Sequence, residues 1–189
     1  NAKGSVLFPA RMHMLFKGIS GVYACANADC NCSHTEGGLT LGEIYLSDGN
    51  LICPHCGSVV YELYNDRRCG ALFFKGYVLE DDAELHGNVY LWRYPGQLMD
   101  HRMKEVHLFI PTEDFELPVK QGKNAIKPCY LDVKSGFINF TDDSSAGKPW
   151  VRKLYDCNYS AKGRPQIITF PTCPHCRHQL STSQLTSFS

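Results

Sequence analysis

Ten cysteines in a chain of 189 residues, several of them in closely spaced pairs, constrain the fold more than any other feature. Six cysteines fall within the first 69 residues, and four lie beyond residue 128. No charged-then-apolar leader precedes them, so a disulfide framework is the weaker interpretation. Metal binding by thiolates is the stronger one.

The sharpest motif is Cys53-Pro54-His55-Cys56-Gly57. Two thiolates separated by two residues can face one tetrahedral ion when the backbone makes a tight turn, here called a knuckle, and the following glycine supplies the backbone freedom that the turn needs. The partner pair, Cys25 and Cys30, lies about two dozen residues upstream, with strand-like sequence between. This arrangement predicts a zinc ribbon. Cys32 is an alternative to Cys30, since either could reach the ion.

A second Cys-Pro-His-Cys knuckle, 173–176, has Arg177 at the position where glycine is preferred. Cys69-Gly70 resembles the second half of a further knuckle whose first half would be at position 66. These motifs predict a second zinc site with Cys69, Cys173 and Cys176 as ligands; a degenerate site that has lost its ion is the alternative. The sequence leaves four candidates open for the fourth ligand: Asp66, Cys129, Cys157 and His178.

Neither site has the features of a catalytic metal centre. Catalytic zinc keeps an open coordination position beside a general base, whereas four thiolates close the shell. The chain contains no His-Glu-x-x-His, no deaminase pattern and no phosphate-binding glycine loop. Cys-Pro-x-Cys also occurs in thiol oxidoreductases at the start of a helix, but here its flanks are turn-like and strand-like. We therefore expect no catalytic residue.

The histidines give no catalytic pattern either. His55 and His175 lie inside the two knuckles, and we expect them to point outward. His34, His107 and the other scattered histidines are expected to lie on the surface or to have hydrogen-bond partners. The cofactor that the sequence predicts is Zn²⁺, with one ion in the first site and a second in the other.

The remaining sequence predicts a mainly β fold with little helix, built from short antiparallel strands rich in Val, Tyr, Phe and Leu. One short helix is expected over 9–16. The acidic run 80–84 suggests two parts, a zinc-ribbon part over 1–80 and a second β-rich part over 81–189, packed as one unit. The predicted strands are 21–24, 43–46, 59–63, 71–79, 88–94, 105–110, a hairpin of 129–133 with 136–140, and a possible pair of 151–155 with 166–170.

Composition and charge limit the partners. The chain is 43% hydrophobic and 20% charged, so it can bury a core. Its nineteen basic and nineteen acidic side chains cancel, which excludes a global basic footprint for nucleic acid. No apolar run approaches the roughly 18–20 residues that span a bilayer, so we expect a cytoplasmic protein with no membrane partner. The chain starts without Met, and we expect it to be part of a longer protein.

One local run, 148–155, combines basic and aromatic side chains that could contact phosphates and stack on unpaired bases. Tyr155 and Tyr159 would contribute aromatic rings, and two arginines beside Cys69 would add charge. An ordinary solvated surface with core aromatics is the alternative. The predicted nucleic-acid-binding residues are Arg67, Arg68, Lys148, Trp150, Arg152, Lys153, Lys162 and Arg164.

Several segments together resemble a family of large bacterial superfamily 2 helicases, which includes the mitomycin-repair type and anti-phage defence helicases of the DISARM, Druantia and Dpd kinds. The resemblance covers most of the chain outside 81–127. The segments are Arg11-Met-His-Met-Leu-Phe16-Lys17-Gly18, Gly21-Val-Tyr-Ala-Cys25-Ala-Asn-Ala-Asp-Cys30, Leu41-Gly-Glu-Ile-Tyr45, the first knuckle, Glu62-Leu-Tyr-Asn-Asp-Arg-Arg-Cys69-Gly70, Tyr130-Leu-Asp-Val-Lys-Ser-Gly136 and the late Cys-Pro-x-Cys.

The resemblance implies a segment that follows the second motor domain and leads into a cysteine-containing C-terminal domain. Any ATPase activity would belong to the parent protein, whose motor motifs lie outside this chain. In one departure, the family has Cys-x-x-Cys-Gly where this chain has Asp66-Arg67-Arg68-Cys69-Gly70, so the second ligand set stays open.

Two functions follow as hypotheses. In the first, the chain is a non-catalytic zinc-binding accessory domain of a DNA helicase or translocase that contacts nucleic acid or braces the motor. In the alternative, it is a structural zinc module that binds partner subunits in a defence or repair complex. An exposed apolar patch formed by part of 72–79 or 90–94 would favour the alternative.

Overall fold

The computed structural model describes residues 21–79, 88–95, 102–118, 124–140, 147–161, 164–181 and 184–188. Every regular element in these ranges is a strand, so the mainly β fold class is confirmed. Within them there is no helix that is long and apolar enough to cross a membrane. The helix expected over 9–16 lies outside the described residues.

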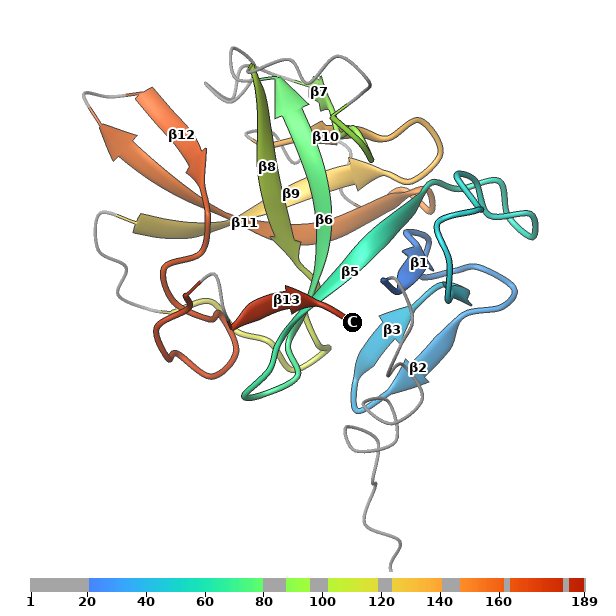
Figure 1. Ribbon diagram of the computed structural model, residues 1–189, viewed down its shortest axis with the longest axis horizontal. Coiled ribbons are helices and arrows are strands. Elements are labelled where there is room, and N and C mark those ends of the chain that lie inside the picture. The colour runs from blue at the N-terminus through green and yellow to red at the C-terminus, as the bar shows by residue number, and fades with distance from the viewer. Residues whose placement is uncertain are drawn as a thin grey trace, which may run out of the picture.

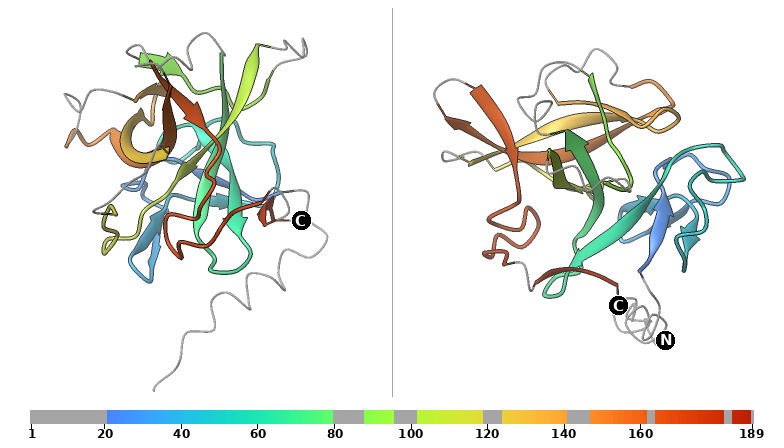
Figure 2. Two further views of the ribbon diagram at one scale, coloured as in Figure 1. Left: turned by 90° about the vertical axis from the view of Figure 1, so that its left-hand side faces the viewer. Right: turned by 45° about the horizontal axis from the view of Figure 1, so that its top comes forward.

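The strands are short and separated by turns, as the sequence predicts, and β2 and β3 form a separate hairpin. The two early strands and β12 lie on opposite sides of the molecule (Figure 1, Figure 2). The strands are β1 (Tyr23–Cys25), β2 (His34–Glu36), β3 (Leu39–Leu41), β4 (Ile44–Tyr45), β5 (Val60–Asp66), β6 (Leu72–Leu79), β7 (Asn88–Tyr90), β8 (Met103–Phe109), β9 (Asn124–Asp132), β10 (Phe137–Asn139), β11 (Val151–Ala161), β12 (Arg164–Ile168) and β13 (Leu185–Ser187).

One antiparallel sheet contains all the other strands, in the order β4-β1-β5-β6-β8-β11-β9-β10-β7, with β12 beside β11 and β13 beside β5. The sheet bends sharply between β8 and β11, which pair only at Phe109 and Tyr155. In Figure 1, β6 and β8 therefore run across β9 and β11 at a steep angle. This bend brings the two halves of the sheet face to face.

A bridge between Tyr77 of β6 and Trp92, just beyond β7, nearly closes the strands from β6 to β7 into a barrel. Each of these two residues donates its backbone N–H to the other's carbonyl oxygen at 2.8 Å. Gly76 makes the close approach possible, because a Cβ there would lie 2.7 Å from the Leu91 Cδ1 atom. Closure leaves fewer unpaired strand edges.

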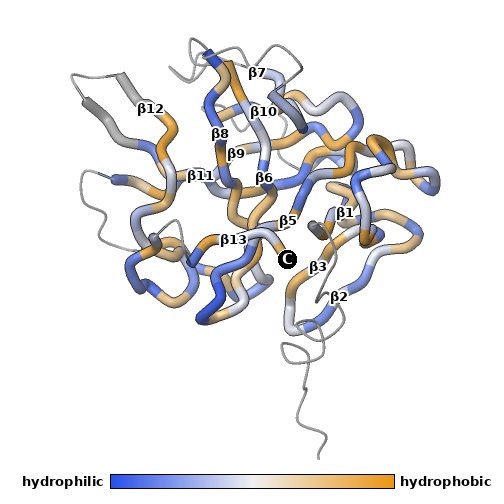
Figure 3. Tube along the Cα trace, in the orientation of Figure 1, coloured by the Kyte–Doolittle hydropathy of each residue, from blue (hydrophilic) through white to orange (hydrophobic). Residues whose placement is uncertain are grey.

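The core fills the space between the two halves of the sheet. Its largest fully buried side chains include Tyr61, Phe74, Leu108, Leu131 and Leu154, which come from five different strands. In Figure 3, hydrophobic and hydrophilic residues alternate along much of these strands, as expected where one face is buried. The division at residue 80 stays a prediction; the core and the β6–β8 pairing both draw on each part.

Most predicted strands have counterparts, but one pairing is wrong. The hairpin of β9 and β10 is confirmed by the pairing of Leu131 with Ile138. By contrast, 151–155 pairs with β9, and β12 pairs with the second half of β11, where Cys157 lies opposite Ile168. The reason is length, since β11 continues to Ala161: β9 pairs along one edge from Val151 to Tyr159, and β12 pairs along the other edge only from Cys157 onward.

Candidate metal centres

Three turns share one backbone geometry, which the sequence predicts only in part. In each, the N–H of the fifth residue donates to the carbonyl oxygen of the first, and the fifth residue has a positive φ, the left-handed region that favours glycine. The bonds are Gly57 N to Cys53 O at 2.7 Å with φ 67°, Gly70 N to Asp66 O at 2.8 Å with φ 75°, and Arg177 N to Cys173 O at 3.0 Å with φ 63°.

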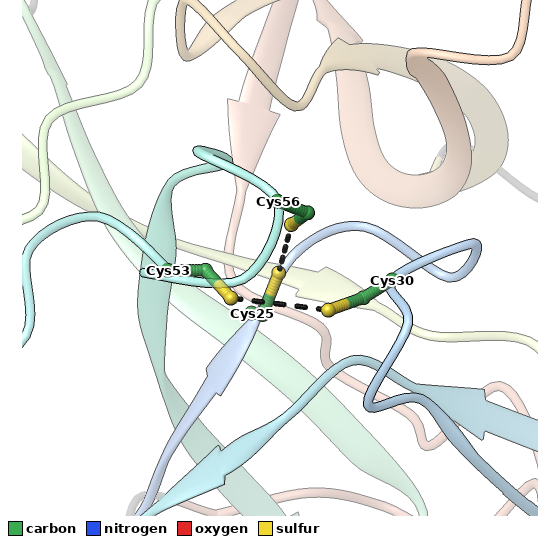
Figure 4. A group of neighbouring side chains, drawn as sticks. All are labelled: Cys25, Cys30, Cys53 and Cys56. Atoms are coloured by element: carbon green, nitrogen blue, oxygen red, sulfur yellow. Dashed lines mark hydrogen bonds between the residues drawn. The ribbon is translucent and has the colours of Figure 1, made fainter.

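The first centre, here called the four-thiol centre, is assembled from three segments at one end of the sheet. Cys25 ends β1, Cys30 lies in the loop that follows, and the knuckle after β4 supplies Cys53 and Cys56. The Sγ atoms of Cys25 and Cys56 are 3.4 Å apart, and those of Cys30 and Cys53 are 3.8 Å apart. Figure 4 shows the four side chains pointing toward a common point.

These distances fit a tetrahedral zinc ion. A Zn–S bond of about 2.3 Å places thiolate sulfurs about 3.8 Å apart, and all four Sγ atoms lie within 4.8 Å of one another. Burial raises the pKa of the Cys25 thiol. Burial also acts to raise the pKa of Cys56, but hydrogen bonds from Ser58 and from neighbouring thiols outweigh it and lower that pKa to about 6. One ligand is therefore largely ionised at neutral pH before a metal binds.

Polar groups outside the four sulfurs orient this centre. The Tyr45 hydroxyl is 3.3 Å from Cys53 Sγ and 2.9 Å from Glu43 Oε2. Burial, together with these two partners, raises the pKa of Tyr45, so its hydroxyl stays protonated and can donate. The Lys134 ammonium donates to the carbonyl oxygen of Cys56. Such contacts from residues outside the ligand set orient the side chains that would bind the metal directly.

The second centre, here called the Asp-three-thiol centre, joins the end of β5 to the late knuckle. It consists of Asp66, Cys69, Cys173 and Cys176, whose ligand atoms all lie within 4.8 Å of one another. The Sγ atoms of Cys69 and Cys173 are 3.6 Å apart. The distances again suit one tetrahedral ion, with a carboxylate oxygen as the fourth ligand.

Asp66 has a separate task for each carboxylate oxygen. Its Oδ1 accepts the Arg68 backbone N–H at 3.0 Å, which holds the turn. Its Oδ2 lies 3.4 Å from Cys69 Sγ and 3.5 Å from Cys176 Sγ. Burial acts to raise the pKa of Asp66, but these hydrogen bonds outweigh it and lower that pKa. Asp66 is therefore ionised at neutral pH, as a ligand must be.

The sequence offers a matched turn that has no thiols. At Asp132 the Oδ1 atom accepts the N–H groups of Lys134 and Ser135 at 2.9 and 3.0 Å, and Gly136 closes the turn with φ 81°. An aspartate in first position therefore builds this turn without neighbouring thiols. Asp66 differs because its second oxygen faces three thiols.

The structure separates the alternatives that the sequence left open. Cys30 lies in the four-thiol centre, whereas Cys32 lies with Glu43 and His55. Cys129 and Cys157 are buried in β9 and β11, away from both centres. His178 is exposed and outside the second group, and His175 is exposed as well. Metal binding by the grouped residues stays a prediction.

One of the predicted nucleic-acid contacts is wrong in its placement. Arg152 turns inward, where its guanidinium donates to the carbonyl oxygens of Ala26 and Thr40 and lies 5.2 Å from the ring centroid of Phe74. Burial lowers the pKa of Arg152 to about 10. The guanidinium holds the loop of the four-thiol centre against β11, and these internal hydrogen bonds occupy the donors that a nucleic-acid phosphate would need. Tyr155, which we expected to stack, is buried.

The other predicted contacts fall into two places. Lys148, Trp150 and Lys153 are exposed around the start of β11. Arg67 and Arg68 lie beside the Asp-three-thiol centre, and each donates to the C-terminal region, Arg67 to Thr186 and Arg68 to the Gln179 carbonyl oxygen. Lys162 lies outside the described residues, and of Arg164 only the backbone, in β12, is described.

His107 also departs from expectation. It is 7% exposed, and neither ring nitrogen has a hydrogen-bond partner among the described residues. Glu105 Oε1 lies 3.3 Å from Nε2, a contact without hydrogen-bond geometry. Burial lowers the pKa of His107 to about 4, so the ring is neutral at physiological pH. No sequence signal separates it from a surface histidine except its place among alternating apolar residues of β8.

Comparison with known proteins gives two matches and one absence. Residues 44–189 match a family described as the YjiV N-terminal domain. The chain is 29% identical over 186 residues to a protein of Escherichia coli (strain UMEA 4076-1) described as Druantia protein DruE. That alignment covers 96% of this chain and 9% of the relative, so the chain spans a small part of that protein's length. No solved structure matches the chain.

The match to Druantia protein DruE agrees with one part of the resemblance seen in the sequence, namely the likeness to proteins of the Druantia kind. The zinc-binding and helicase parts of that resemblance stay predictions.

Proposed function

The chain belongs to the YjiV N-terminal domain family, and from this premise we propose that it is a non-catalytic, zinc-stabilised accessory domain of a much larger anti-phage defence protein. The parent would be an ATP-dependent helicase or translocase in the cytoplasm. The 96% of this chain that aligns with 9% of the Druantia relative supports a larger parent.

The observation that carries the proposal is the convergence of two sets of four metal-binding side chains. In each, four ligand atoms lie within 4.8 Å of one another, and the side chains of three members of the first set are buried. Four protein ligands leave no coordination position for a substrate, which favours a structural role for zinc over catalysis. The ligands of each set come from segments that are far apart in the sequence.

Elemental analysis of the purified chain tests this proposal. We expect two zinc ions per chain after removal of loosely bound metal, and loss of the folded state when a strong chelator removes them. One retained ion would support the four-thiol centre alone. Disulfides between these cysteines, or a folded chain without any metal, would refute the structural role of zinc.

Within this role, contact with single-stranded nucleic acid is supported by the surface around the start of β11. Trp150 is 46% exposed, and the exposed Lys148 and Lys153 flank it in sequence. An exposed indole between two cations can stack on a base while the ammonium groups meet phosphates. Asp156, three positions after Lys153, is buried, whereas Asp142 and Asp143, before Lys148, lie outside the described residues.

Titration of single-stranded DNA against salt tests this contact. Two phosphate contacts predict a slope of about −1.4 for log affinity against log salt. Replacing Lys148 and Lys153 by Glu should remove most of the binding, and Trp150→Ala should weaken it by about 1–3 kcal/mol through lost stacking. The matched control is Lys127→Glu, which changes an exposed lysine on the neighbouring strand β9. Binding that is independent of salt would contradict this contact.

A protein-binding role is the second candidate, and a specific observation favours it. Trp92 is 45% exposed and Tyr94 is 42% exposed, within the segment 90–94 whose exposure was expected to indicate an interface. Trp92 packs against Tyr90 with ring centroids 4.5 Å apart, and Phe137, 47% exposed, meets the same tyrosine ring. Exposed aromatic clusters are typical of protein interfaces.

Co-purification with the remainder of the parent protein separates the two candidates. A complex that survives nuclease treatment and is lost in the double variant Trp92→Ser, Phe137→Ser would support the interface. Trp150→Ser is the matched control, because it removes an equally exposed tryptophan elsewhere. A complex that depends on Trp150 and disappears with nuclease would instead support the nucleic-acid contact.

A further inference from the structure

A third group of metal-binding side chains lies beside the four-thiol centre, and the zinc ribbon does not use it. Cys32, Glu43 and His55 each offer one ligand atom, and these atoms all lie within 4.8 Å of one another. The group combines a thiol, a carboxylate and an imidazole, each of which is a common zinc ligand. Three protein ligands of mixed type leave one coordination position for water or an outside ligand.

Two of the three segments that hold this group also build the four-thiol centre, and the third, which carries Glu43 just before β4, lies beside β1. Cys32 follows Cys30 in the loop, and His55 lies between the two cysteines of the knuckle. The backbone oxygen of Glu43 accepts the Cys25 N–H at 2.9 Å, which ties its strand to β1. Zinc in the four-thiol centre would therefore fix the backbone positions of all three outer ligands.

The side chains are also positioned individually. Glu43 Oε2 accepts a hydrogen bond from the Tyr45 hydroxyl at 2.9 Å and lies 2.9 Å from His55 Nε2. Cys32 is half-buried and packs against the cluster of Tyr23, Cys25 and Val60. Tyr45 supports both groups, because the same hydroxyl lies 3.3 Å from Cys53 Sγ. A ligand carboxylate that is held by an outer hydrogen bond is typical of metal sites.

Charge favours a cation at this place. Four thiolates and one Zn²⁺ leave two negative charges at the neighbouring centre. A thiolate from Cys32, the Glu43 carboxylate and a neutral His55 would carry two further negative charges, which a second Zn²⁺ would balance. The group is open to solvent, since 46% of the His55 side chain and 27% of the Glu43 side chain are exposed. The open coordination position therefore faces water.

We propose that Cys32, Glu43 and His55 form a separate, exchangeable Zn²⁺ site next to the closed four-thiol centre, with water in its fourth position. This goes beyond the structural role of the two closed centres. Because the ion at this site has three protein ligands and solvent access, it leaves faster than the ion in the four-thiol centre. It is suited to receive zinc first and to pass it inward, or to bind an outside donor.

The late knuckle supplies a matched comparison within the same chain. His175 takes the place between Cys173 and Cys176 that His55 takes in the first knuckle, and it is also exposed on the surface. Among the described residues, however, His175 belongs to no group of three metal-binding side chains. The two histidines thus share a sequence context and differ in their neighbours.

Zinc stoichiometry at saturation tests the proposal with the whole chain. Chains equilibrated with excess Zn²⁺ and freed of unbound metal should hold three ions, of which a chelator of intermediate strength removes one quickly. His55→Asn and Cys32→Ser should each reduce saturation by one ion and abolish the fast phase, with the other two ions and the folded state retained. His175→Asn should leave three ions and the fast phase unchanged.

Three results would overturn the proposal. Saturation of the unchanged chain without a fast-exchanging ion would show that Glu43 and His55 form only an ion pair. Loss of two ions in Cys32→Ser would place this thiol in the four-thiol centre. An equal effect of His55→Asn and His175→Asn would assign the extra ion to exposed histidines in general. Failure of either closed centre to bind zinc lowers the total in all variants alike, and so it is distinguishable.

Discussion

The two closed centres have almost the same donor geometry but connect the chain over very different distances. The four-thiol centre joins Cys30 to Cys53, 23 residues apart, whereas the Asp-three-thiol centre joins Cys69 to Cys173, 104 residues apart. A zinc ion in the first would order a local loop. An ion in the second would hold the C-terminal segment on the turn between β5 and β6.

This difference in sequence separation indicates how each centre would contribute to stability. Closing a loop about four times longer costs about 1.2 kcal/mol more entropy, since each doubling costs about 0.6 kcal/mol. β13 pairs with β5 alone, and Phe188 just beyond it joins the main core, whereas β1 lies between β4 and β5 and its segment supplies Val22, Ala24 and Ala26 to that core. We therefore expect the first centre to be coupled to global folding and the second to local docking of the C-terminal segment.

The largest effect is expected for Cys25→Ser. Cys25 is fully buried at the end of β1, and loss of its thiolate should release the first zinc and expose neighbouring core residues. Structural zinc contributes about 10–16 kcal/mol in small zinc domains, so a loss of at least about 4 kcal/mol is expected. For a chain of this size that lowers Tm by about 8–16 °C. Thermal unfolding, with zinc content measured in parallel, checks this.

For Cys173→Ser we expect a smaller and local effect. The second zinc should be lost and proteolysis should begin at the late knuckle, while the main thermal transition falls by about half as much as in Cys25→Ser. Limited proteolysis with mass spectrometry reports the position of the first cuts. Equal loss of global stability in the two variants would break the comparison.

Asp66 tests whether the carboxylate is a true ligand. Asp66→Cys adds a fourth thiolate and should tighten zinc binding at the second centre, whereas Asp66→Asn keeps the acceptor for the Arg68 N–H but removes the charge. We expect Asp66→Asn to weaken binding by about tenfold or more, which is about 1.4 kcal/mol. Asp132→Asn, in the turn without thiols, is the control, and chelator competition is the measurement. Unchanged affinity in Asp66→Asn would assign the residue to the turn alone.

The smallest effect concerns the fifth residue of each knuckle. Arg177 has φ 63° where the first knuckle has Gly57 at φ 67°. A non-glycine residue in this region costs about 1–3 kcal/mol, and glycine recovers most of that at an entropic cost of about 0.5–1 kcal/mol. Arg177→Gly should therefore stabilise the second centre by about 1 kcal/mol, and Gly57→Ala should destabilise the first by about as much. Arg177→Ala, which removes the guanidinium but keeps the strain, should give no gain.

The sequence predicts the first centre better than the second for a physical reason. The knuckle around Cys53 carries both of its thiols and its glycine within five residues, so local backbone geometry alone brings them together. The second centre brings together Asp66 and Cys173, which no local rule connects. Its fourth ligand stayed open among four residues because only the packing of β5 against the C-terminal segment decides which of them is near.

The sequence also predicts which side chains are exposed and which are buried with uneven success. The run 148–155 has the charges and rings of a nucleic-acid contact, but a strand exposes only alternate residues, so Lys153 faces solvent while Arg152 turns toward the loop of the first centre. His107 looks like any scattered histidine in the sequence. Its burial follows from β8 lying between β6 and β11.

The sequence by itself determined the β class and predicted three thiols of the first centre, with Cys30 and Cys32 both open for the fourth, because strand alternation and knuckle geometry are local properties that a few neighbouring residues define. The tertiary structure alone decided the near closure of the barrel, the partners of Asp66 and the placement of Cys32 with Glu43 and His55. Those features depend on strands meeting across long stretches of chain, and their positions are set by the shared core and not by any one segment.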